Sequence, residues 1–298
     1  MTTFSPTGIQ VHLSHGDVTA QISQVGASLR SLRIAGVDIV PPYPLDQPAP
    51  SASGVVLVPW PNRVRDGRWR DEGTERQLSI SEPKFGNASH GLLRFAPYEI
   101  DQTDAAATLR AMVVPQTGYP YLIETSVTYL LTDAGVHVTH TLTNRSSTPA
   151  PVALGIHPFV TIGDVDPHEL VLRVDAATAF DTDERSLPVG TRPADPTLRD
   201  GVRIGDVTLD TGLTDLTRDE DGLVRHTVTA PDGRRVTLWQ GEDFDYVQVF
   251  TTTKYPGQPV ALAIEPMTAP ADALNSGLGI RRLAPDETWT LRWGIEFG

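Results

Sequence analysis

Two polar residues follow apolar runs and are themselves followed by proline, and both have side chains that can move protons. The run 260–264 is typical of a buried strand and leads directly into Glu265, where Pro266 is expected to end the strand. His157 ends another apolar run and precedes Pro158 in the same way, and an imidazole can exchange protons near neutral pH. Burying a charged carboxylate without partners costs several kcal/mol. Glu265 should therefore gain hydrogen-bond donors or face a cavity, unless it simply reaches water.

A third polar stretch combines an amide with a guanidinium. Asn62 and Arg63 follow an apolar run and two prolines, so a stiff loop should hold both side chains at the edge of the core. Such a pair can bind neighbouring hydroxyl groups of a ligand, whereas the ordinary alternative is an arginine paired with a surface carboxylate. We favour that alternative for Arg65, Arg68 and Arg70, which continue the same stretch.

Among the other histidines, His90 has the surroundings most typical of a site. It lies in a stretch with glycine at positions 86 and 91, and these glycines allow the backbone to approach a neighbour closely. A single loop histidine is more often simply solvated, so its position leaves both interpretations open. Two further pairs are spaced three residues apart, which puts their rings on opposite faces of a strand and prevents chelation of one metal: His12 with His15, and His137 with His140.

Composition and missing motifs argue against several classes of protein. The 298-residue chain contains no cysteine, so neither disulfides nor thiolate chemistry is expected. No HExxH, GxGxxG, P-loop or GxSxG motif occurs, so a protein-held metal and a nucleotide cofactor are not expected. The formal net charge of −13 argues against nucleic acid as a partner. Neither an apolar leader nor a run of about 18 apolar residues occurs, and we expect a cytoplasmic protein without a membrane partner.

The dominant period of the sequence is two, which predicts strands. Residues 18–22 and 29–34 predict two short strands around a turn at Gly26, and hairpins are predicted over 127–142 and 224–239. Apolar residues alternate with polar ones to the end of the chain, at Trp289, Leu291, Trp293, Ile295 and Phe297. No window of 11 residues shows a helical stripe, and 25 glycines with 25 prolines supply turns. We predict an all-β protein of large antiparallel sheets, folded as one domain over residues 1–298.

Taken in order, these stretches resemble the aldose 1-epimerase (galactose mutarotase) family. The resemblance rests on Asn62-Arg63, His90-Gly91, Gly155-Ile-His157-Pro-Phe159, Gln248-Val-Phe250-Thr-Thr252, Glu265-Pro-Met-Thr-Ala-Pro-Ala-Asp272-Ala-Leu-Asn275-Ser-Gly277 and Leu283-Ala-Pro285-Asp-Glu287. It runs from about Gly54 to the C-terminus, in the family's order. One such motif is weak evidence, but the ordered series is strong. The resemblance implies a β-supersandwich fold, no cofactor, a small-molecule sugar as substrate, and interconversion of the α and β anomers of free aldoses.

By this resemblance Glu265 matches the general base and His157 the general acid. The hydroxyl-binding groups that it implies are Arg63, His90, Asp210 and Gln248, with Asn62 beside them. Glu265 would take the proton of the C1 hydroxyl while protonated His157 gives one to the ring oxygen, which opens the ring to the aldehyde. Rotation about the C1–C2 bond and ring closure then give the other anomer. A neighbouring carboxylate favours a protonated His157, whereas desolvation opposes it.

Two of these assignments have alternatives. Asp215 lies in a setting similar to that of Asp210. We prefer Asp210 as the hydroxyl-binding aspartate, because Asp210 follows an apolar residue at an expected strand end. Phe159 is followed by valine where the family more often has a second aromatic residue, so the surface on which a sugar stacks is not fixed. Trp60 and Trp239 are candidates for that surface, although core packing is the better interpretation for Trp239.

The substrate class also has alternatives. Parts of the first two stretches resemble a bacterial branch of the family that includes epimerases of sulfonated sugars, and Arg65, Arg68, Arg94 or Lys84 could meet an anionic group at C6. Rim charges in an acidic protein are an equally good interpretation of these residues. A hexose 6-phosphate epimerase would use the same acid and base with a cationic pocket. A non-catalytic carbohydrate-binding β-sandwich would keep the sugar contacts without needing the acid and base.

Overall fold

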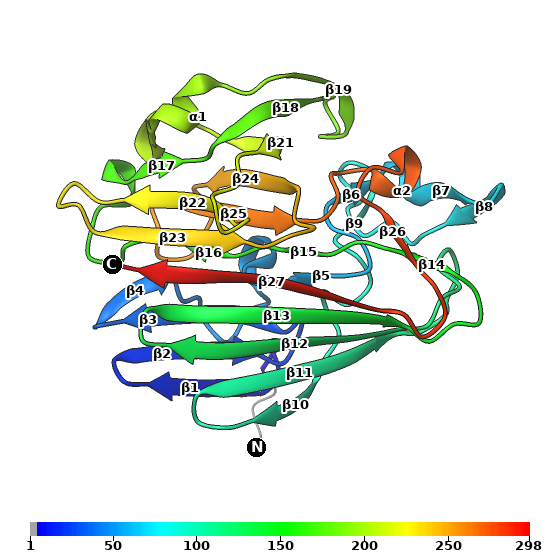
Figure 1. The fold of residues 1–298 in the computed structure, drawn as a ribbon, viewed down its shortest axis with the longest axis horizontal. Helices are drawn as coiled ribbons and strands as arrows, with labels where there is room; N and C mark the ends of the chain where they lie inside the picture. Colours follow the sequence, from blue (N-terminus) through cyan, green and yellow to red (C-terminus); the bar gives the residue numbers. More distant parts are fainter. Residues whose placement is uncertain (1–4) are drawn as a thin grey trace.

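The chain forms two large antiparallel sheets, and the first of them contains nine strands. The computed structural model describes residues 5–298. The strands follow one another across this sheet in the order β10 (Glu99–Gln102), β11 (Ala106–Val113), β12 (Ile123–Thr132), β13 (Gly135–Asn144), β27 (Thr288–Phe297), β23 (Arg235–Gln240), β22 (Val224–Thr229), β17 (Val171–Arg173) and β20 (Val202–Arg203). Neighbouring strands are antiparallel throughout. Figure 1 shows this sheet across the front of the molecule, with β10 at its lower edge.

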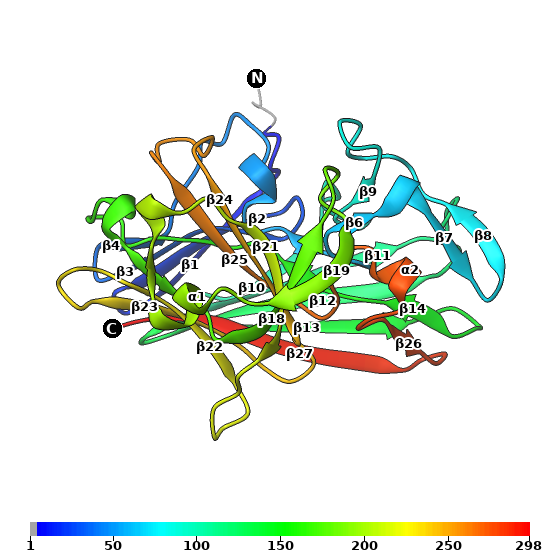
Figure 2. The same ribbon diagram turned by 90° about the horizontal axis from the view of Figure 1, so that it is seen from above.

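The second large sheet has eight strands and holds several of the polar residues described above. Its strands are β19 (Pro188–Pro193), β18 (Ala176–Thr182), β21 (Asp210–Leu216), β24 (Tyr246–Thr252), β25 (Ala261–Met267), β15 (Gly155–Ile156) and β5 (Val56–Leu57), with β16 (Phe159–Val160) also paired to β25. In Figure 2, β24 and β25 cross the molecule at an angle to β13 and β27 of the first sheet. Gln248 on β24 lies opposite Glu265 on β25.

Smaller sheets and short helices complete the fold. The smaller sheets are β1 (Gln10–His15), β2 (Val18–Ser23), β3 (Ser28–Ile34) and β4 (Val37–Val40) in one, and the pairs β14 (Ala150–Val152) with β26 (Arg281–Leu283), β6 (Arg63–Val64) with β9 (Ala88–Ser89), and β7 (Arg68–Asp71) with β8 (Thr74–Gln77). The helices are α1 (Pro196–Asp200) and α2 (Ala273–Ser276), with 3₁₀ turns at Pro50–Ala52, Arg65–Gly67, Pro167–Glu169 and Ile204–Asp206. Over residues 5–298, no helix is both long and apolar enough to cross a membrane.

The C-terminal strand shows why the sheets stack. Trp289, Leu291, Trp293 and Ile295 are all buried, as their alternation predicted, because a sheet that is apolar on one face must cover that face. Their side chains belong to one continuous core that also contains residues of the small sheet β1–β4 and of the eight-stranded sheet. The prediction of an all-β protein with large antiparallel sheets is confirmed.

The predicted hairpins are present, with somewhat longer strands. β12 pairs with β13, β22 with β23, and β2 with β3, each around the turn that the sequence indicated. On β13, His137 is exposed and His140 is buried, so the two rings lie on opposite faces as expected. The period of two was therefore a sound guide to which residues face the core.

One prediction about strand ends is wrong. Pro266 does not end β25, which continues one residue beyond it. The backbone amides of Ile264 and Thr268 donate to the neighbouring segment on either side of a gap between β15 and β16. Pro266 lies between these two amides and has no N–H, so its missing donor falls where the sheet is already interrupted. His157 lies in this interruption, which places its side chain beside that of Glu265.

Candidate active site

A cavity of about 350 Å³ collects the polar residues that the sequence analysis identified. Its walls come from β21, β24 and β25 and from the segments around β6 and β9. The lining residues are Ser51, Ala52, Asn62, Arg63, Ser81, Glu82, Ser89, His90, Arg94, His157, Asp210, Gln248, Phe250 and Glu265. All seven residues proposed as site residues from the sequence are among them. The volume falls in the range of small-molecule sites, about 300–1,000 Å³.

Glu265 and His157 meet in this cavity. Nε2 of His157 lies 3.3 Å from Oε1 of Glu265, and the side chains are only 7% and 3% exposed. The backbone of His157 is fixed at both ends, because its N–H donates to Val55 and its carbonyl accepts from Gly54. Glu265 is held in the middle of the sheet, on β25. Two groups that can each hold a proton are therefore within reach of one ligand.

Burial shifts the two pKa values in opposite directions. Desolvation raises the pKa of Glu265 well above its ordinary value of 4.5; the charge of Asp210 raises it further, and Arg63 opposes the shift. Desolvation lowers the pKa of His157 to about 3. A backbone hydrogen bond raises this pKa in part, and the charge of Arg94 lowers it further. Of the two opposing effects expected for His157, desolvation is thus the larger. His157 is neutral at pH 7 in this structure, and Glu265 is the more basic member of the pair.

Gln248 and Asp210 form a second polar pair in the cavity. Nε2 of Gln248 donates a hydrogen bond to Oδ1 of Asp210 over 2.6 Å. Gln248 lies directly opposite Glu265 in the register of β24 and β25, so the Gln248–Asp210 pair is next to the contact between Glu265 and His157. An amide nitrogen has a second N–H and a carboxylate has a second oxygen. The pair can therefore still donate to one ligand hydroxyl and accept from another.

Arg63 is held by a carboxylate that the sequence analysis did not identify. Its Nε and Nη2 atoms donate to the two oxygens of Glu82 over 2.8 and 2.9 Å. This two-pronged geometry is that of a strong charge-assisted pair, and it fixes the plane of the guanidinium. Within residues 5–298, Nη1 of Arg63 has no hydrogen-bond partner. That nitrogen remains available to a ligand in the cavity.

A close backbone contact holds Asn62 and His90 in place. Both have left-handed backbones, with φ of 53° and 63°, which is uncommon for residues other than glycine. The backbone N–H of His90 donates to the carbonyl of Asn62 over 2.9 Å. A Cβ at Gly91 would lie only 2.1 Å from the carbonyl oxygen of Val58, so the loop needs glycine there. This is the close approach that the glycines of the sequence indicated.

The ring of His90 lies edge-on to the ring of His157, with 5.7 Å between the ring centres. Desolvation lowers the pKa of His90 well below its ordinary value of 6.5, and positive charge on His157 (when protonated), Arg94 and Arg63 acts in the same direction. His90 is therefore neutral at pH 7. A neutral imidazole offers a ligand one N–H donor and one acceptor, which suits a hydroxyl group better than a charged partner.

Two phenylalanines lie next to His157, and one of them lines the cavity. Phe159 stacks on His157, with ring centres 5.4 Å apart and planes 21° apart. Phe250 lies edge-on to His157 at 6.2 Å and lines the cavity. Trp60 is 1% exposed and lies in the core, so it does not supply the aromatic platform considered from the sequence. Trp239 is buried outside the cavity, in keeping with the packing role preferred for it.

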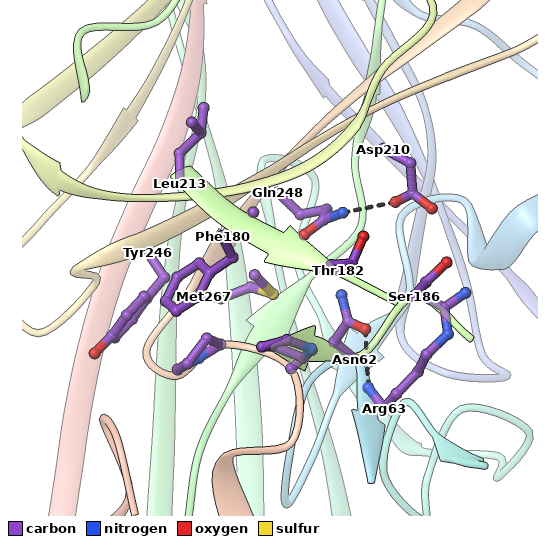
Figure 3. Close-up of a pocket in the computed structure, with 14 residues that line it drawn as sticks. Asn62, Arg63, Phe180, Thr182, Ser186, Asp210, Leu213, Tyr246, Gln248 and Met267 are labelled. Carbon is purple, nitrogen blue, oxygen red and sulfur yellow. Dashed lines mark hydrogen bonds between the residues drawn. The ribbon is translucent and has the colours of Figure 1, made fainter. Parts of the chain in front are cut away.

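A smaller, mainly apolar pocket adjoins the cavity and is shown in Figure 3. Phe180, Tyr246 and Met267 lie together in this view, and the hydrogen bond between Gln248 and Asp210 is drawn beside them. The residues common to the pocket and the cavity are Asn62, Arg63, Asp210 and Gln248. The Gln248–Asp210 pair therefore lies between the polar cavity and the apolar pocket. A bound ligand can place a polar face in the cavity and an apolar face in the pocket.

Of the alternatives considered from the sequence, Arg94 lines the cavity, whereas Asp215, Arg65, Arg68 and Lys84 do not. Asp215 is exposed and does not line the cavity, whereas Asp210 does. Arg65 pairs with two carboxylates, in agreement with its interpretation as a surface ion pair. Arg68 is exposed and donates to an amide instead of a carboxylate. Arg70 is also exposed and has no ion pair within residues 5–298, contrary to expectation.

Sequence reasoning gave no role to six of the cavity residues: Ser51, Ala52, Ser81, Glu82, Ser89 and Phe250. Phe250 lies in a stretch used for the family resemblance, and its alternation with Gln248 on one strand face would have placed it. Glu82 lies in a loop and Ala52 in a 3₁₀ turn, so no regular period distinguished them from surface residues. Within residues 5–298, no group of three or more His, Asp or Glu residues is arranged to hold a metal ion.

Comparison with known proteins shows which family the chain resembles. The sequence profile of the family described as aldose 1-epimerase matches residues 10–296, so the similarity begins well before Gly54. The uncharacterized protein YihR of Escherichia coli K12 is 30% identical over 291 residues, which cover 97% of this chain and 93% of YihR.

Solved structures share the fold. A galactose mutarotase-like protein from Clostridium acetobutylicum has a TM-score of 0.85 at 18% identity, over 97% of this chain and 95% of that chain. Galactose 1-epimerase from Lactobacillus acidophilus NCFM has a TM-score of 0.78 at 17% identity, over 97% of this chain and 94% of that chain. The predicted β-supersandwich of the galactose mutarotase type is confirmed.

Proposed function

Because the chain belongs to the aldose 1-epimerase family, we propose that it interconverts the α and β anomers of a free aldohexose or a related sugar. The observation that carries this proposal is the contact between His157 and Glu265, whose Nε2 and Oε1 atoms are 3.3 Å apart in a cavity of sugar size. Ring opening of a hemiacetal needs one group to take a proton and another to give one. The cavity supplies both, from two adjacent segments of one sheet.

In the proposed reaction, Glu265 takes the proton of the C1 hydroxyl and His157 gives a proton to the ring oxygen. The electrons of the O1–H bond form the carbonyl as the bond between C1 and the ring oxygen breaks, and the free aldehyde results. Rotation about the C1–C2 bond presents the other carbonyl face. The ring oxygen then attacks C1, its proton returns to His157, and Glu265 returns a proton to O1.

The two residues need only one transferable proton between them. Burial lowers the pKa of His157 and raises that of Glu265, and both shifts favour the carboxyl side for a proton shared by the pair. A sugar hydroxyl that donates to Glu265 stabilises the carboxylate and lowers its pKa. A ring oxygen that accepts from His157 favours the imidazolium. Sugar binding therefore moves the proton toward the arrangement that the reaction needs.

The remaining polar residues of the cavity bind hydroxyl groups in this proposal. Arg63 donates from Nη1, and neutral His90 and Asn62 provide further donors and acceptors at the same wall. Asp210 and Gln248, on the neighbouring strands β21 and β24, provide further donors and acceptors. These contacts hold the sugar with C1 next to Glu265 and His157. Proton transfer then occurs between groups that are already correctly positioned.

The direct test of the proposed activity is anomer exchange. Wild-type protein is expected to accelerate the exchange of at least one sugar above the rate in buffer, measured by saturation-transfer NMR and polarimetry. The panel consists of glucose, galactose, their 6-phosphates and 6-deoxy-6-sulfoglucose. Each acid or base group contributes about 10²- to 10⁴-fold, so the effect should be far above background. Binding of these sugars without any acceleration would instead identify a carbohydrate-binding sandwich and refute the proposal.

A second prediction concerns Glu82, which holds Arg63 in position but has no proposed contact with the reacting atoms. Glu82→Gln keeps the size of the side chain but removes the charge and one of two acceptors for Arg63. We expect KM for the best sugar to rise about 10-fold while kcat changes less than about 3-fold, since a charge-assisted hydrogen bond contributes about 1.5–3 kcal/mol.

The control for this variant is Glu75→Gln, which removes the same charge from an exposed position of β8. Glu75→Gln should leave both constants at wild-type values. A fall in kcat for Glu82→Gln with KM unchanged would show that Glu82 does not act by orienting a substrate-binding group.

A further inference from the structure

The distal half of the β18–β19 hairpin separates from the rest of the eight-stranded sheet. β18 pairs with β21 at Ala176, Thr178 and Ala179, and over residues 5–298 the pairing between these two strands ends there. The first residues of β21 pair with β24 and not with β18. The sheet therefore forks beyond Ala179. The small apolar pocket of Figure 3 lies in this fork, because residues of the hairpin line it together with the start of β21.

The separated part of the hairpin forms one wall of that pocket. Thr182, Ser186 and Pro188 line the pocket, and in Figure 3 the first two lie between Asp210 and Arg63. Four of the proposed hydroxyl-binding residues border both the pocket and the larger cavity. The position of the hairpin therefore decides whether these residues are covered or open to water.

The tip of the hairpin is a turn held by its own hydrogen bonds. Oδ1 of Asp183 accepts from the backbone N–H groups of Arg185 and Leu187 over 2.9 and 3.0 Å. The N–H of Ser186 donates to the carbonyl of Asp183, and Ser186 has a left-handed backbone with φ of 55°. Leu187 is buried. The backbone that carries the side chain of Arg185 is thus fixed in place.

Arg185 joins this tip to segments that lie 98 to 119 residues earlier in the chain. Its Nε atom donates to the carbonyl of Phe85 over 2.8 Å. Its Nη2 atom donates to Oδ1 of Asn87 over 2.9 Å and to Oδ1 of Asp66 over 2.8 Å. In return, Nδ2 of Asn87 donates to the carbonyl of Arg185 over 3.4 Å. Figure 2 shows the hairpin reaching toward β6 and β9, where these segments lie.

The loop that Arg185 contacts begins at Glu82, the partner of Arg63. Its two ends are bonded to each other, because the N–H of Glu82 donates to the carbonyl of Asn87 and the N–H of Asn87 donates to the carbonyl of Glu82. Asn87 is buried, and its Nδ2 atom lies 3.5 Å from Oε2 of Glu82. A guanidinium bonded to Phe85 and Asn87 therefore holds the loop that orients Arg63, as well as the hairpin.

An ordinary surface ion pair does not account for these contacts. The side chains of Arg185 and Asp66 are 28% and 55% exposed, so their charge pair alone contributes little. The bonds to Phe85 and Asn87 are independent of Asp66, and they use the planar fork of donors that only arginine has. Arg192 lies on the same hairpin, but over residues 5–298 its hydrogen bonds stay within the hairpin.

We propose that Arg185 is a positioning residue that holds the β18–β19 hairpin against the loop 82–87 and so keeps the sugar-binding wall closed. This inference rests on the proposed epimerase function. A closed hairpin keeps water away from the Gln248–Asp210 pair, and hydrogen bonds to a ligand are stronger where water is excluded. Over residues 5–298, Arg185 makes no hydrogen bond to Glu265 or His157. Its loss should therefore weaken sugar binding more than proton transfer.

The first test is anomer-exchange kinetics of Arg185→Met with the sugar that the wild-type protein accelerates most. KM should rise about 10-fold or more while kcat changes less than about 3-fold, since several hydrogen bonds of a charged group are lost from a wall that binds substrate. Arg185→Lys keeps the charge without the fork of donors, so it should restore KM only in part. Arg192→Met removes an arginine from the same hairpin without breaking the bridge, and it should leave both constants unchanged.

The second test measures the motion of the hairpin itself. Because the chain contains no cysteine, Glu184→Cys gives a nitroxide label one attachment point, at an exposed position of the tip. The electron paramagnetic resonance spectrum should show a more mobile label in the Arg185→Met background than in the wild-type background. Saturating sugar should reduce that mobility, because the sugar binds the closed hairpin more tightly. The Arg192→Met background should match wild type.

The outcomes separate this inference from the epimerase proposal. If Arg185→Met keeps the wild-type KM, or if its kcat falls with KM unchanged, Arg185 does not position the sugar-binding wall although the protein is an epimerase. If the wild-type protein accelerates no sugar, the epimerase proposal fails. The label then tests Arg185 alone: greater mobility in Arg185→Met than in Arg192→Met supports its hold on the hairpin, and equal mobility overturns it.

Discussion

Replacing Glu265 with glutamine is expected to lower kcat for anomer exchange by about 10²- to 10⁴-fold. The amide has the shape of the carboxyl group and can still accept a hydrogen bond from the C1 hydroxyl, but it cannot take the proton. KM should change much less than kcat, because the contact remains while the transfer is lost. Exchange NMR over a range of sugar concentrations gives both constants.

The same substitution should not unfold the protein. Folding raises the pKa of Glu265 above 4.5, so the folded state binds more protons than the unfolded state between that value and the raised one. Wild-type stability therefore falls as the pH rises through this interval, and glutamine removes the loss. The melting temperature of the variant relative to wild type should increase with pH above about 4.5.

Asp71→Asn is the matched control for Glu265→Gln. Asp71 is also a buried carboxylate, at 3% exposure, but it pairs with Arg282 outside the cavity. This variant should lose stability and keep the kcat of the folded protein. The assignment of Glu265 as the base is wrong if Glu265→Gln stays folded with kcat within about 3-fold of wild type.

Replacing His157 with glutamine is expected to cause the second large loss, again about 10²- to 10⁴-fold in kcat. The amide nitrogen of glutamine can reach the position of Nε2 and donate a hydrogen bond to the ring oxygen. It cannot deliver its proton at neutral pH, so the leaving ring oxygen must take one from water. Exchange NMR measures this loss, and KM should again change less than kcat.

The effect of burying His157 on stability can be separated from its proposed role as the acid. Folding lowers the pKa of His157 from 6.5 to about 3, so its contribution is present above 6.5 and is lost as the pH falls toward 3. His226→Gln is a matched control, since the pKa of His226 is lowered to about 4 by burial and its ring contacts Gln240 outside the cavity. Both variants should resist acid better than wild type, but only His157→Gln should lose kcat. Equal kcat values in the two variants would contradict the role of His157.

The sequence was most informative where one local pattern decides the outcome. Alternation along β27 identified the buried face, because successive side chains of a strand point to opposite sides. Glu265 and His157 stood out because a polar residue at the end of an apolar run has to find partners or a cavity. Both residues line the same cavity. They meet there because β25 continues through Pro266 opposite a gap in the sheet, and His157 lies in that gap. No local sequence pattern could reveal this gap.

Features that depend on tertiary contacts were beyond the sequence. Glu82 holds Arg63 although 19 residues separate them, and a loop glutamate has no periodicity that would point to this. Trp60 looked available as a sugar platform, yet its place in the core follows from the packing of several strands. Four cations were equal candidates for an anionic group until their partners were known. Among these four, only Arg94 lines the cavity, and no local pattern of the sequence indicated this.

The central claim is that His157 and Glu265 act together on one sugar, and the double variant His157→Gln/Glu265→Gln tests it most directly. Residues that act as one unit show strongly non-additive losses. The account predicts that the exchange rate of the double variant, measured by NMR beside both single variants, lies within about 3-fold of the slower single variant. A rate reduced by the product of the two single losses would show that the residues act independently and would contradict the account.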